Sequence, residues 1–431
     1  MNIFKYTLKS IAFALTHPYF LLILSIIFII LYKKNKRIAA IQGMIMGYKK
    51  NLSLELTMSE IVIGIFAGTL GSILLSYLGI TFSENSGIDL VFLASIIFML
   101  WRPRFMCFSY SASIVGLISL FLIQLAQVLK IPNFNALNID IPALMTLVAV
   151  LHFIEGILVI LDGKRGAIPV FSKRGDKIIG GFAMERYWVL PITLFIILSD
   201  KSILQFTSEV PMPQWWPILK TSIPNNMLQN AILTLIPFYG VVGYKGITFT
   251  KTKEEKNLST GVFLIAYSII IFLLAQLANL NIYLKILVLL VAPLMHEYMM
   301  RFEINREVTD KPKYVSDSDG IMVLDVAPDS PAMEMGVKSG DLLIEINNNK
   351  IENEEDIFNI IRAGVNFIWF KVKRDNGNIV ELNYNSMNST KNMGIIFVPK
   401  ALAKDDLTVH IADKKIMEFI KRIKQKDHKN N

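Results

Sequence analysis

Long apolar runs fill most of the chain up to about residue 300, and they constrain its fold more than any other feature of the sequence. A helix needs about 20 predominantly apolar residues to cross the hydrocarbon core of a bilayer. The chain is 53% hydrophobic and only 18% charged, whereas an average soluble domain has about 25% charged residues. The sequence therefore predicts a membrane protein, with a soluble region only near its C-terminal end.

The apolar runs predict a polytopic α-helical membrane domain over residues 1–303, with about nine spans. The third and sixth predicted spans are short, and they could instead be re-entrant segments or half-spans. The nine predicted spans are residues 12–32, 61–80, 88–101, 105–129, 142–162, 187–199, 228–243, 258–278 and 282–300.

Basic residues are concentrated in alternate loops of this predicted bundle. They lie in residues 33–50, 102–104, 164–177 and 245–256. Cytoplasmic loops of membrane proteins carry an excess of Lys and Arg, so this placement, rather than nucleic-acid binding, explains the net charge of +9. Nine spans with this alternation predict an external N-terminus and a cytoplasmic C-terminal domain.

The region after the last predicted span has the composition of a soluble domain. Residues 304–313 are predicted to be a linker and residues 314–399 a small α/β domain, in which short β-rich segments alternate with turns. The run GIMVLDVAPDSPAMEMGVKSGDLLIEIN resembles a bacterial PDZ domain in its SPA, GVxxGD and IN elements. This resemblance implies a partly open antiparallel sheet barrel and a peptide-binding function.

PDZ domains bind an extended peptide that adds a strand to an exposed sheet edge, and backbone N–H groups hold its terminal carboxylate. The peptide is thus an internal segment or C-terminus of another protein. An alternative is that the glycine of the implied carboxylate loop only makes a turn. The resemblance implies a groove formed by Met393, Gly394, Ile395, Ile396 and Phe397 on one side and by a helix carrying Ile357 and Ile361 on the other.

The charge of the predicted domain and of the tail after it indicates which partners the protein can bind. The predicted domain has more acidic than basic residues, so we expect it to bind neither nucleic acid nor lipid headgroups, and membrane lipid is expected to contact the spans alone. Residues 400–431 are predicted to be a basic amphipathic tail, with Ile416, Ile420 and Ile423 on one side. This tail is either a solvated end helix or a contact with the membrane surface or a partner.

Ionisable residues within spans are candidates for function by default. His152 and Glu155 share one face of the fifth predicted span, and His296 and Glu297 lie near the end of the ninth. The latter pair begins the HExxH pattern of zinc proteases, but Met300 takes the place of the second histidine.

These four residues are predicted to be structural polar contacts, with no catalytic residue, metal ligand or cofactor. The L-D-G motif of site-2-type intramembrane proteases is present at residues 161–163, but it precedes the His-Glu pair, which is the wrong order. The single cysteine, Cys107, excludes an intrachain disulfide and a cluster of several thiolates, and it is interpreted as packing. An active or degenerate protease and proton or ion movement remain alternatives.

A many-span membrane region followed by one PDZ domain resembles the MinJ-type proteins of Gram-positive bacteria. The resemblance includes KRGAIPVFSKRGDKIIGGF after LHFIEG, and HEY just before the PDZ domain. It implies a non-enzymatic cell-division scaffold in the cell membrane, at the septum or the poles. The implied partners are DivIVA-like and MinD-like proteins of the Min system. A transporter with a regulatory PDZ domain is a further alternative.

Overall fold

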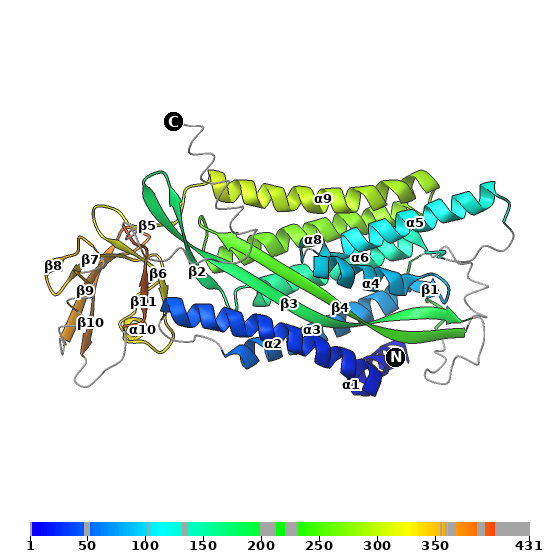
Figure 1. The fold of residues 1–431 in the computed structure, drawn as a ribbon, viewed down its shortest axis with the longest axis horizontal. Coiled ribbons are helices and arrows are strands. Elements are labelled where there is room, and N and C mark those ends of the chain that lie inside the picture. Colours follow the sequence, from blue (N-terminus) through cyan, green and yellow to red (C-terminus); the bar gives the residue numbers. More distant parts are fainter. Residues whose placement is uncertain are drawn as a thin grey trace.

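A computed structural model describes residues 2–46, 52–101, 103–131, 137–198, 213–219, 232–353, 356–357, 360, 367–385 and 393–400. An elongated helical bundle, with a long β-hairpin running along it, carries a sheet domain at one end (Figure 1). Six helices of the described chain are long and apolar enough to cross a membrane. They are α2 (Pro18–Met46), α3 (Ser53–Leu78), α5 (Phe108–Val128), α6 (Ile141–Asp162), α8 (Lys253–Leu277) and α9 (Ile282–Thr309).

The expected count of nine helical spans is therefore not supported. The sixth and seventh predicted spans fall on two long strands, β3 (Lys177–Leu198) and β4 (Ile232–Thr248). These strands pair antiparallel from Phe182 opposite Thr248 to Leu198 opposite Ile232. Both runs are apolar on every face and rich in β-branched and aromatic residues, which is the pattern that periodicity alone cannot distinguish from a buried helix.

The third predicted span is a helix of only 14 residues, α4 (Ile88–Trp101). Such a helix is about 21 Å long, which is shorter than the hydrocarbon core of about 30 Å. A 3-10 turn, η1 (Pro103–Met106), leads from it into α5. Cys107, between η1 and α5, contacts His152 in the middle of α6. The α4–α5 turn therefore lies inside the bundle.

Helix α3 covers the middle of the β3 edge that faces away from β4, between the stretches of that edge that pair with β2 (Ile168–Arg174) and β1 (Thr81–Ser83). Backbone N–H groups inside a membrane need internal partners. The Tyr187 N–H donates to Glu60 Oε1 at 3.1 Å, and the Thr193 N–H donates to Ser72 Oγ at 2.9 Å. Pro191, between them, has no N–H to satisfy. Side chains of one helix thus replace the missing neighbouring strand.

Close approach of α3 to β3 depends on glycine. A Cβ atom at Gly64 would overlap the carbonyl oxygen of Val189, and one at Gly68 would lie 2.7 Å from that of Pro191. Glu60, Gly64, Gly68 and Ser72 recur every four residues, so they share one face of α3. Two small and two polar residues on that face therefore fit the helix to a strand backbone.

A buried ion-pair network joins α2, α3, α6 and β3 where the hairpin approaches the C-terminal domain. Arg186 is 1% exposed and donates from both Nε and Nη2 to Asp162 Oδ2, at 3.0 and 2.6 Å. Its Nη1 lies 3.3 Å from Glu60 Oε1, which also pairs with Lys34 at 2.6 Å. Trp188 Nε1 donates to the same Asp162 oxygen at 2.9 Å.

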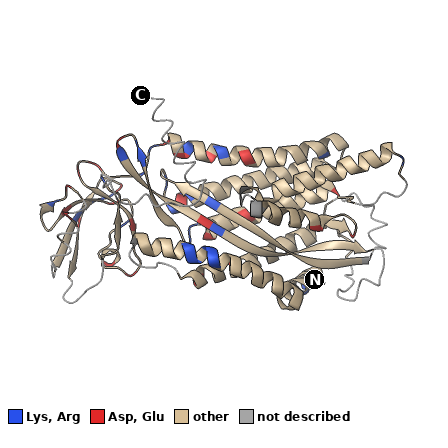
Figure 2. Ribbon diagram, in the orientation of Figure 1, with Lys and Arg blue, Asp and Glu red and all other residues tan. Residues whose placement is uncertain are grey.

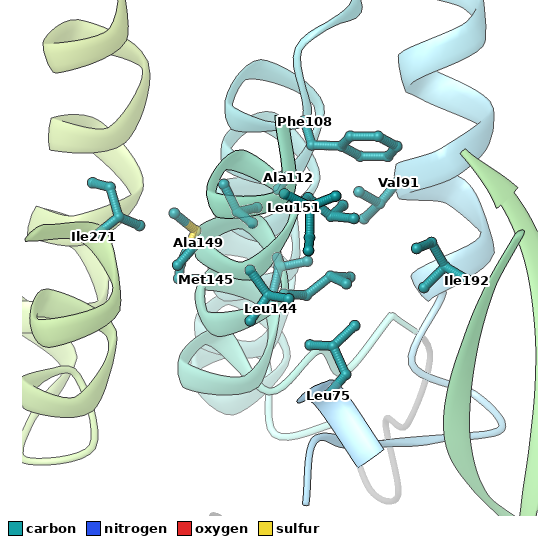
Figure 3. Packing of buried hydrophobic residues seen from close by; sticks show 14 of the residues in the cluster. Leu75, Val91, Phe108, Ala112, Leu144, Met145, Ala149, Leu151, Ile192 and Ile271 are labelled. Carbon is teal, nitrogen blue, oxygen red and sulfur yellow. The ribbon is translucent and has the colours of Figure 1, made fainter. Parts of the chain in front are cut away.

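The apolar core of the bundle is centred on α6, the most buried of the six long helices. Its side chains fill the space between α8 on one side and the α4–α5 pair and β3 on the other (Figure 3). Leu144 and Leu151, for example, are fully or almost fully buried. An all-round apolar helix belongs in the centre of such a bundle. Polar side chains of α6 such as those of His152 and Asp162 are therefore enclosed by protein.

The C-terminal domain is a sheet of antiparallel strands in the order β10-β9-β7-β6-β11, with β8 on β7. Helix α9 continues to Thr309 and so covers most of the expected linker. Of the predicted tail 400–431, all but Lys400 lies outside the described residues, as does Ile361. The remaining elements are α1 (Asn2–Thr16), β1 (Thr81–Ser83), β2 (Ile168–Arg174), β5 (Tyr314–Val315), β6 (Ile321–Val326), α10 (Pro331–Glu334), β7 (Leu342–Ile346), β8 (Asn349–Lys350), β9 (Phe367–Lys373), β10 (Ile379–Asn385) and β11 (Ile395–Phe397).

The C-terminal domain is docked on the bundle. β5 pairs with β3 at Ile179 and Gly180, so the strand that leads into the domain belongs to the bundle's sheet. Lys253 Nζ at the start of α8 lies 3.0 Å from Asp325 Oδ1 of β6. Burial raises the pKa of Tyr314 to about 12, so its phenol stays protonated in the contact. Figure 2 shows that most Lys and Arg residues of the bundle gather at this docked end.

Candidate functional site

The first candidate site is the edge of the C-terminal sheet formed by β11. This strand ends the sheet and pairs with β6 on one side, with Ile395 opposite Val326. No strand of the described chain pairs with its other side. An unpaired edge of this kind can accept an extended peptide as an additional strand.

Gly394, which precedes β11, is fixed by its backbone. Its φ is +74°, and a Cβ atom there would lie 2.7 Å from the Cβ of Ala327. Its carbonyl oxygen accepts from the Ala327 N–H at 2.7 Å, and that of Met393 accepts from the Ala332 N–H at 3.2 Å. This geometry explains the glycine as a tight turn that positions the strand. Carboxylate binding by the same loop stays a prediction.

The predicted groove residues divide between two apolar clusters. Met393 is buried in the domain core beside the fully buried Ile357, and Ile395 and Phe397 pack against the same core while remaining half-buried. Ile396 points to the other side, where it packs against the cluster that docks the domain on the bundle. The structure therefore brings Met393, Ile357, Ile395 and Phe397 together, and it separates Ile396 from them.

The second candidate site lies inside the bundle around His152. Its Nδ1 is 2.8 Å from the carbonyl oxygen of Val148, an acceptor only, so Nδ1 carries the proton and donates. In a neutral ring the lone pair is then on Nε2. Nε2 lies 2.9 Å from Cys107 Sγ and 3.2 Å from Ser109 Oγ. The ring is 2% exposed, so this arrangement is shielded from solvent.

His296 of α9 completes this cluster. Its ring centroid is 5.6 Å from that of His152, and Tyr267 lies edge-on to both rings. Cys107, His152 and His296 each offer one ligand atom, and these three atoms lie within 4.8 Å of one another. The two histidines, far apart in the sequence, thus meet across the bundle.

The two carboxylates have different surroundings. Glu155 Oε2 lies 4.0 Å from His152 Nε2, so it borders the cluster. Glu297 Oε1 instead pairs with Arg301 Nε at 2.7 Å, one turn along α9, and Glu297 Oε2 accepts from the Tyr110 hydroxyl at 3.3 Å. Of the two, Glu155 is the acid adjoining the histidines.

Sequence reasoning missed Cys107. It placed this residue inside a continuous span, whereas Cys107 caps the N-terminus of α5, and the Ser109 N–H donates to its Sγ at 3.4 Å. The loop predicted at residues 102–104 marks the chain reversal, but the sequence does not show that Cys107 precedes the following helix. The depth of that reversal in the bundle depends on tertiary packing.

Comparison with protein-family models identifies a PDZ domain at residues 322–368. This match confirms the resemblance for the C-terminal region, which is therefore a PDZ domain. It covers β6 to the start of β9, and β11 follows it in the chain. No curated protein matches the chain.

Proposed function

We propose that this protein is a non-enzymatic membrane scaffold, which uses its PDZ domain to hold peptide segments or C-termini of other proteins at the membrane. A PDZ domain and several apolar helices in one chain support protein interaction combined with membrane association. The observation that carries the proposal is the docked domain, whose β11 keeps an edge free of any described strand. A scaffold needs a membrane anchor and a peptide-binding domain that is held in a fixed position relative to the anchor.

The docked end of the bundle is proposed to face the cytoplasm. Most basic residues of the bundle gather there (Figure 2), and cytoplasmic segments of membrane proteins carry the excess of Lys and Arg. The finer proposal rests on the resemblance to MinJ-type proteins: recruitment of DivIVA-like and MinD-like cell-division proteins to the septum or poles.

Peptide binding by the full-length chain in lipid nanodiscs tests the proposal. A library of peptides with free C-termini is screened, and the best binder is titrated against wild type and Ile395→Lys. A lysine on β11 places a charge against the apolar side of the groove, so we expect at least a tenfold weaker affinity. Ile379→Lys is the matched control, because Ile379 is an exposed isoleucine on β10, at the opposite end of the same sheet.

Equal peptide affinity of wild type and Ile395→Lys would show that the peptide does not bind beside β11.

Imaging of a fluorescent fusion in dividing cells tests the finer proposal. Signal that stays uniform over the membrane, with or without the division proteins, would refute recruitment to the septum or poles.

The variant Glu297→Gln distinguishes a protease from a scaffold. A metalloprotease with Glu297 as its base would lose cleavage of membrane substrates, whereas a scaffold keeps its peptide affinity. Arg301 and Tyr110 already engage both oxygens of Glu297, which supports a structural role. The transporter alternative predicts solute flux in proteoliposomes that Ile395→Lys leaves unchanged.

A further inference from the structure

We infer that Cys107, His152 and His296 form a binding site for a transition-metal ion of the zinc class, held inside the membrane bundle. The three ligand atoms lie within 4.8 Å of one another. Tetrahedral zinc has Zn–S bonds of about 2.3 Å and Zn–N bonds of about 2.0 Å, which place its donor atoms about 3.5 Å apart. Shifts of about 1 Å in these side chains therefore suffice to surround an ion.

The protonation state of His152 is the one that a metal ligand needs. Its Nδ1–H donates to the Val148 carbonyl, and its Nε2 lone pair points at the Cys107 sulfur. Metal-binding histidines commonly donate their second N–H to a backbone carbonyl, which fixes the tautomer and the ring orientation. Helix α6 supplies this carbonyl from one turn earlier, so the ligand is oriented before any ion binds.

His296 supplies a second, independent observation. The ring is 7% exposed, and its Nδ1 is buried with no hydrogen-bond partner among the described residues. A buried polar atom without a partner is costly, and more so in a membrane. Coordination of an ion by Nδ1 would remove that cost, because it gives this nitrogen the partner that the described residues do not supply.

Buried hydrogen bonds surround the three ligands and hold their helices together. Ser109 Oγ lies 2.6 Å from the Tyr267 hydroxyl, and that hydroxyl donates to the Ala292 carbonyl at 3.0 Å. Ser109 and Tyr267 are both almost fully buried. These contacts tie α5, α8 and α9 together directly around the three ligands.

Charge balance favours a divalent ion with Glu155 beside it; Glu155 lies outside the 4.8 Å group of the three ligand atoms, so it would have to move farther than they do to become a fourth ligand. Binding of the ion removes the thiol proton of Cys107, which leaves one net positive charge on the site. The Glu155 carboxylate, 4.0 Å from His152 Nε2, cancels this charge. A neutral four-coordinate site suits the membrane interior and is typical of structural zinc. The ion would then clamp the α4–α5 turn to α6 and α9, independently of peptide binding.

Metal analysis of the full-length protein tests this site. The protein is purified in detergent from zinc-replete cells, with an affinity tag free of histidine, and is dialysed against a weak chelator. We expect about one zinc per chain for wild type. We expect at least a fivefold lower content for Cys107→Ser and for the double variant Cys107→Ser/His296→Asn. His17→Asn, in a histidine outside the cluster, is the control and should keep its zinc.

Cobalt replacement gives a second readout. Co²⁺-loaded wild type and His17→Asn should show a thiolate-to-cobalt absorption band, and Cys107→Ser should lack it. Size-exclusion profiles identify any variant that fails to fold. The zinc content of wild type tests the site even if a variant fails to fold. Zinc in wild type at no more than the level of the double variant would overturn the proposal and leave a Cys–His hydrogen bond only.

Discussion

At the scale of single residues, Arg186 joins two buried carboxylates from different helices. It is 1% exposed and bonds Asp162, Glu60 and Ser59, which belong to two different helices. A buried ion pair contributes little over an apolar pair, but removal of one partner leaves an unpaired buried charge, which costs about 3–5 kcal/mol. Arg186 therefore matters chiefly to Asp162, because Glu60 also pairs with Lys34 at 2.6 Å.

Arg186→Met is expected to lower the free energy of unfolding by about 3 kcal/mol or more, because Asp162 loses its buried cation and Glu60 loses one of its two cations. Chemical unfolding in detergent, followed by tryptophan fluorescence, measures the change. Lys245→Met is the matched control: Lys245 pairs with Glu185 on the same hairpin at a partly exposed site, where an ion pair is worth about 0–1 kcal/mol. Equal losses in the two variants would refute the role of burial.

The candidate sites were predictable residue by residue only in part. His152, Glu155 and His296 stand out because ionisable groups are rare in apolar runs, and the structure brings them to one place. Cys107 does not stand out, since a buried cysteine is usually packing. Its position beside His152 follows from how deep the α4–α5 turn lies, which no local pattern records.

At the scale of elements, the fit of α3 to β3 determines how a two-stranded hairpin is accommodated in the bundle. Glu60 and Ser72 satisfy strand N–H groups, and Gly64 and Gly68 allow the helix backbone to approach the strand. Small residues at such contacts are the usual means of close packing between membrane elements. The spacing of four residues on α3 is visible in the sequence, but the strand against which this face packs is not.

Gly64→Ala is expected to destabilise the protein, because the added methyl group overlaps the backbone of Val189 rather than a side chain that can move. Gly71→Ala on the same helix is the matched control. Its methyl group would lie 3.6 Å from Ile154 and Ile192, an ordinary contact, and alanine is the better helix former by about 1 kcal/mol. Thermal unfolding should therefore separate the two variants in opposite directions.

The helices were predicted well wherever an apolar run was long. Helices α6, α8 and α9 coincide with predicted spans, since about 20 apolar residues leave few alternatives. β3 was misassigned because a strand buried on both faces loses the alternation that identifies a strand, and β4 because its sequence is almost continuously apolar. Their pairing partners and the shielding by α3 are tertiary features, so the sequence pattern alone favoured helices.

At the scale of the whole molecule, β5, the strand just before the PDZ domain, belongs to the sheet of the bundle, whereas the strands of the PDZ domain form a second sheet. β5 pairs with β3, and Gly180 lies where a Cβ atom would meet Val398 and Leu324 of the domain. Lys253 adds an ion pair with Asp325 and stacks on Phe182 at 4.4 Å. Apolar contact, strand pairing and charge therefore all hold the domain in one orientation.

Asp325→Lys is expected to loosen this docking, because it places a like charge against Lys253 at a largely buried site. The amides of Tyr314 and Val315 should then exchange with solvent at least tenfold faster, as hydrogen exchange can measure. Asp319→Lys, at an exposed position of the same domain, is the control. Unchanged exchange in Asp325→Lys would show that the ion pair does not contribute to docking.

The joint between β5 and the membrane sheet also determines where a captured protein is held. A domain on a flexible tether samples a large volume, and its ligand is diluted within that volume. Here β3, β5 and β6 connect the groove to the bundle through strand pairing and a short segment. Proteins captured by neighbouring copies would therefore be confined to a thin layer next to the bilayer, where their effective concentration towards one another is high.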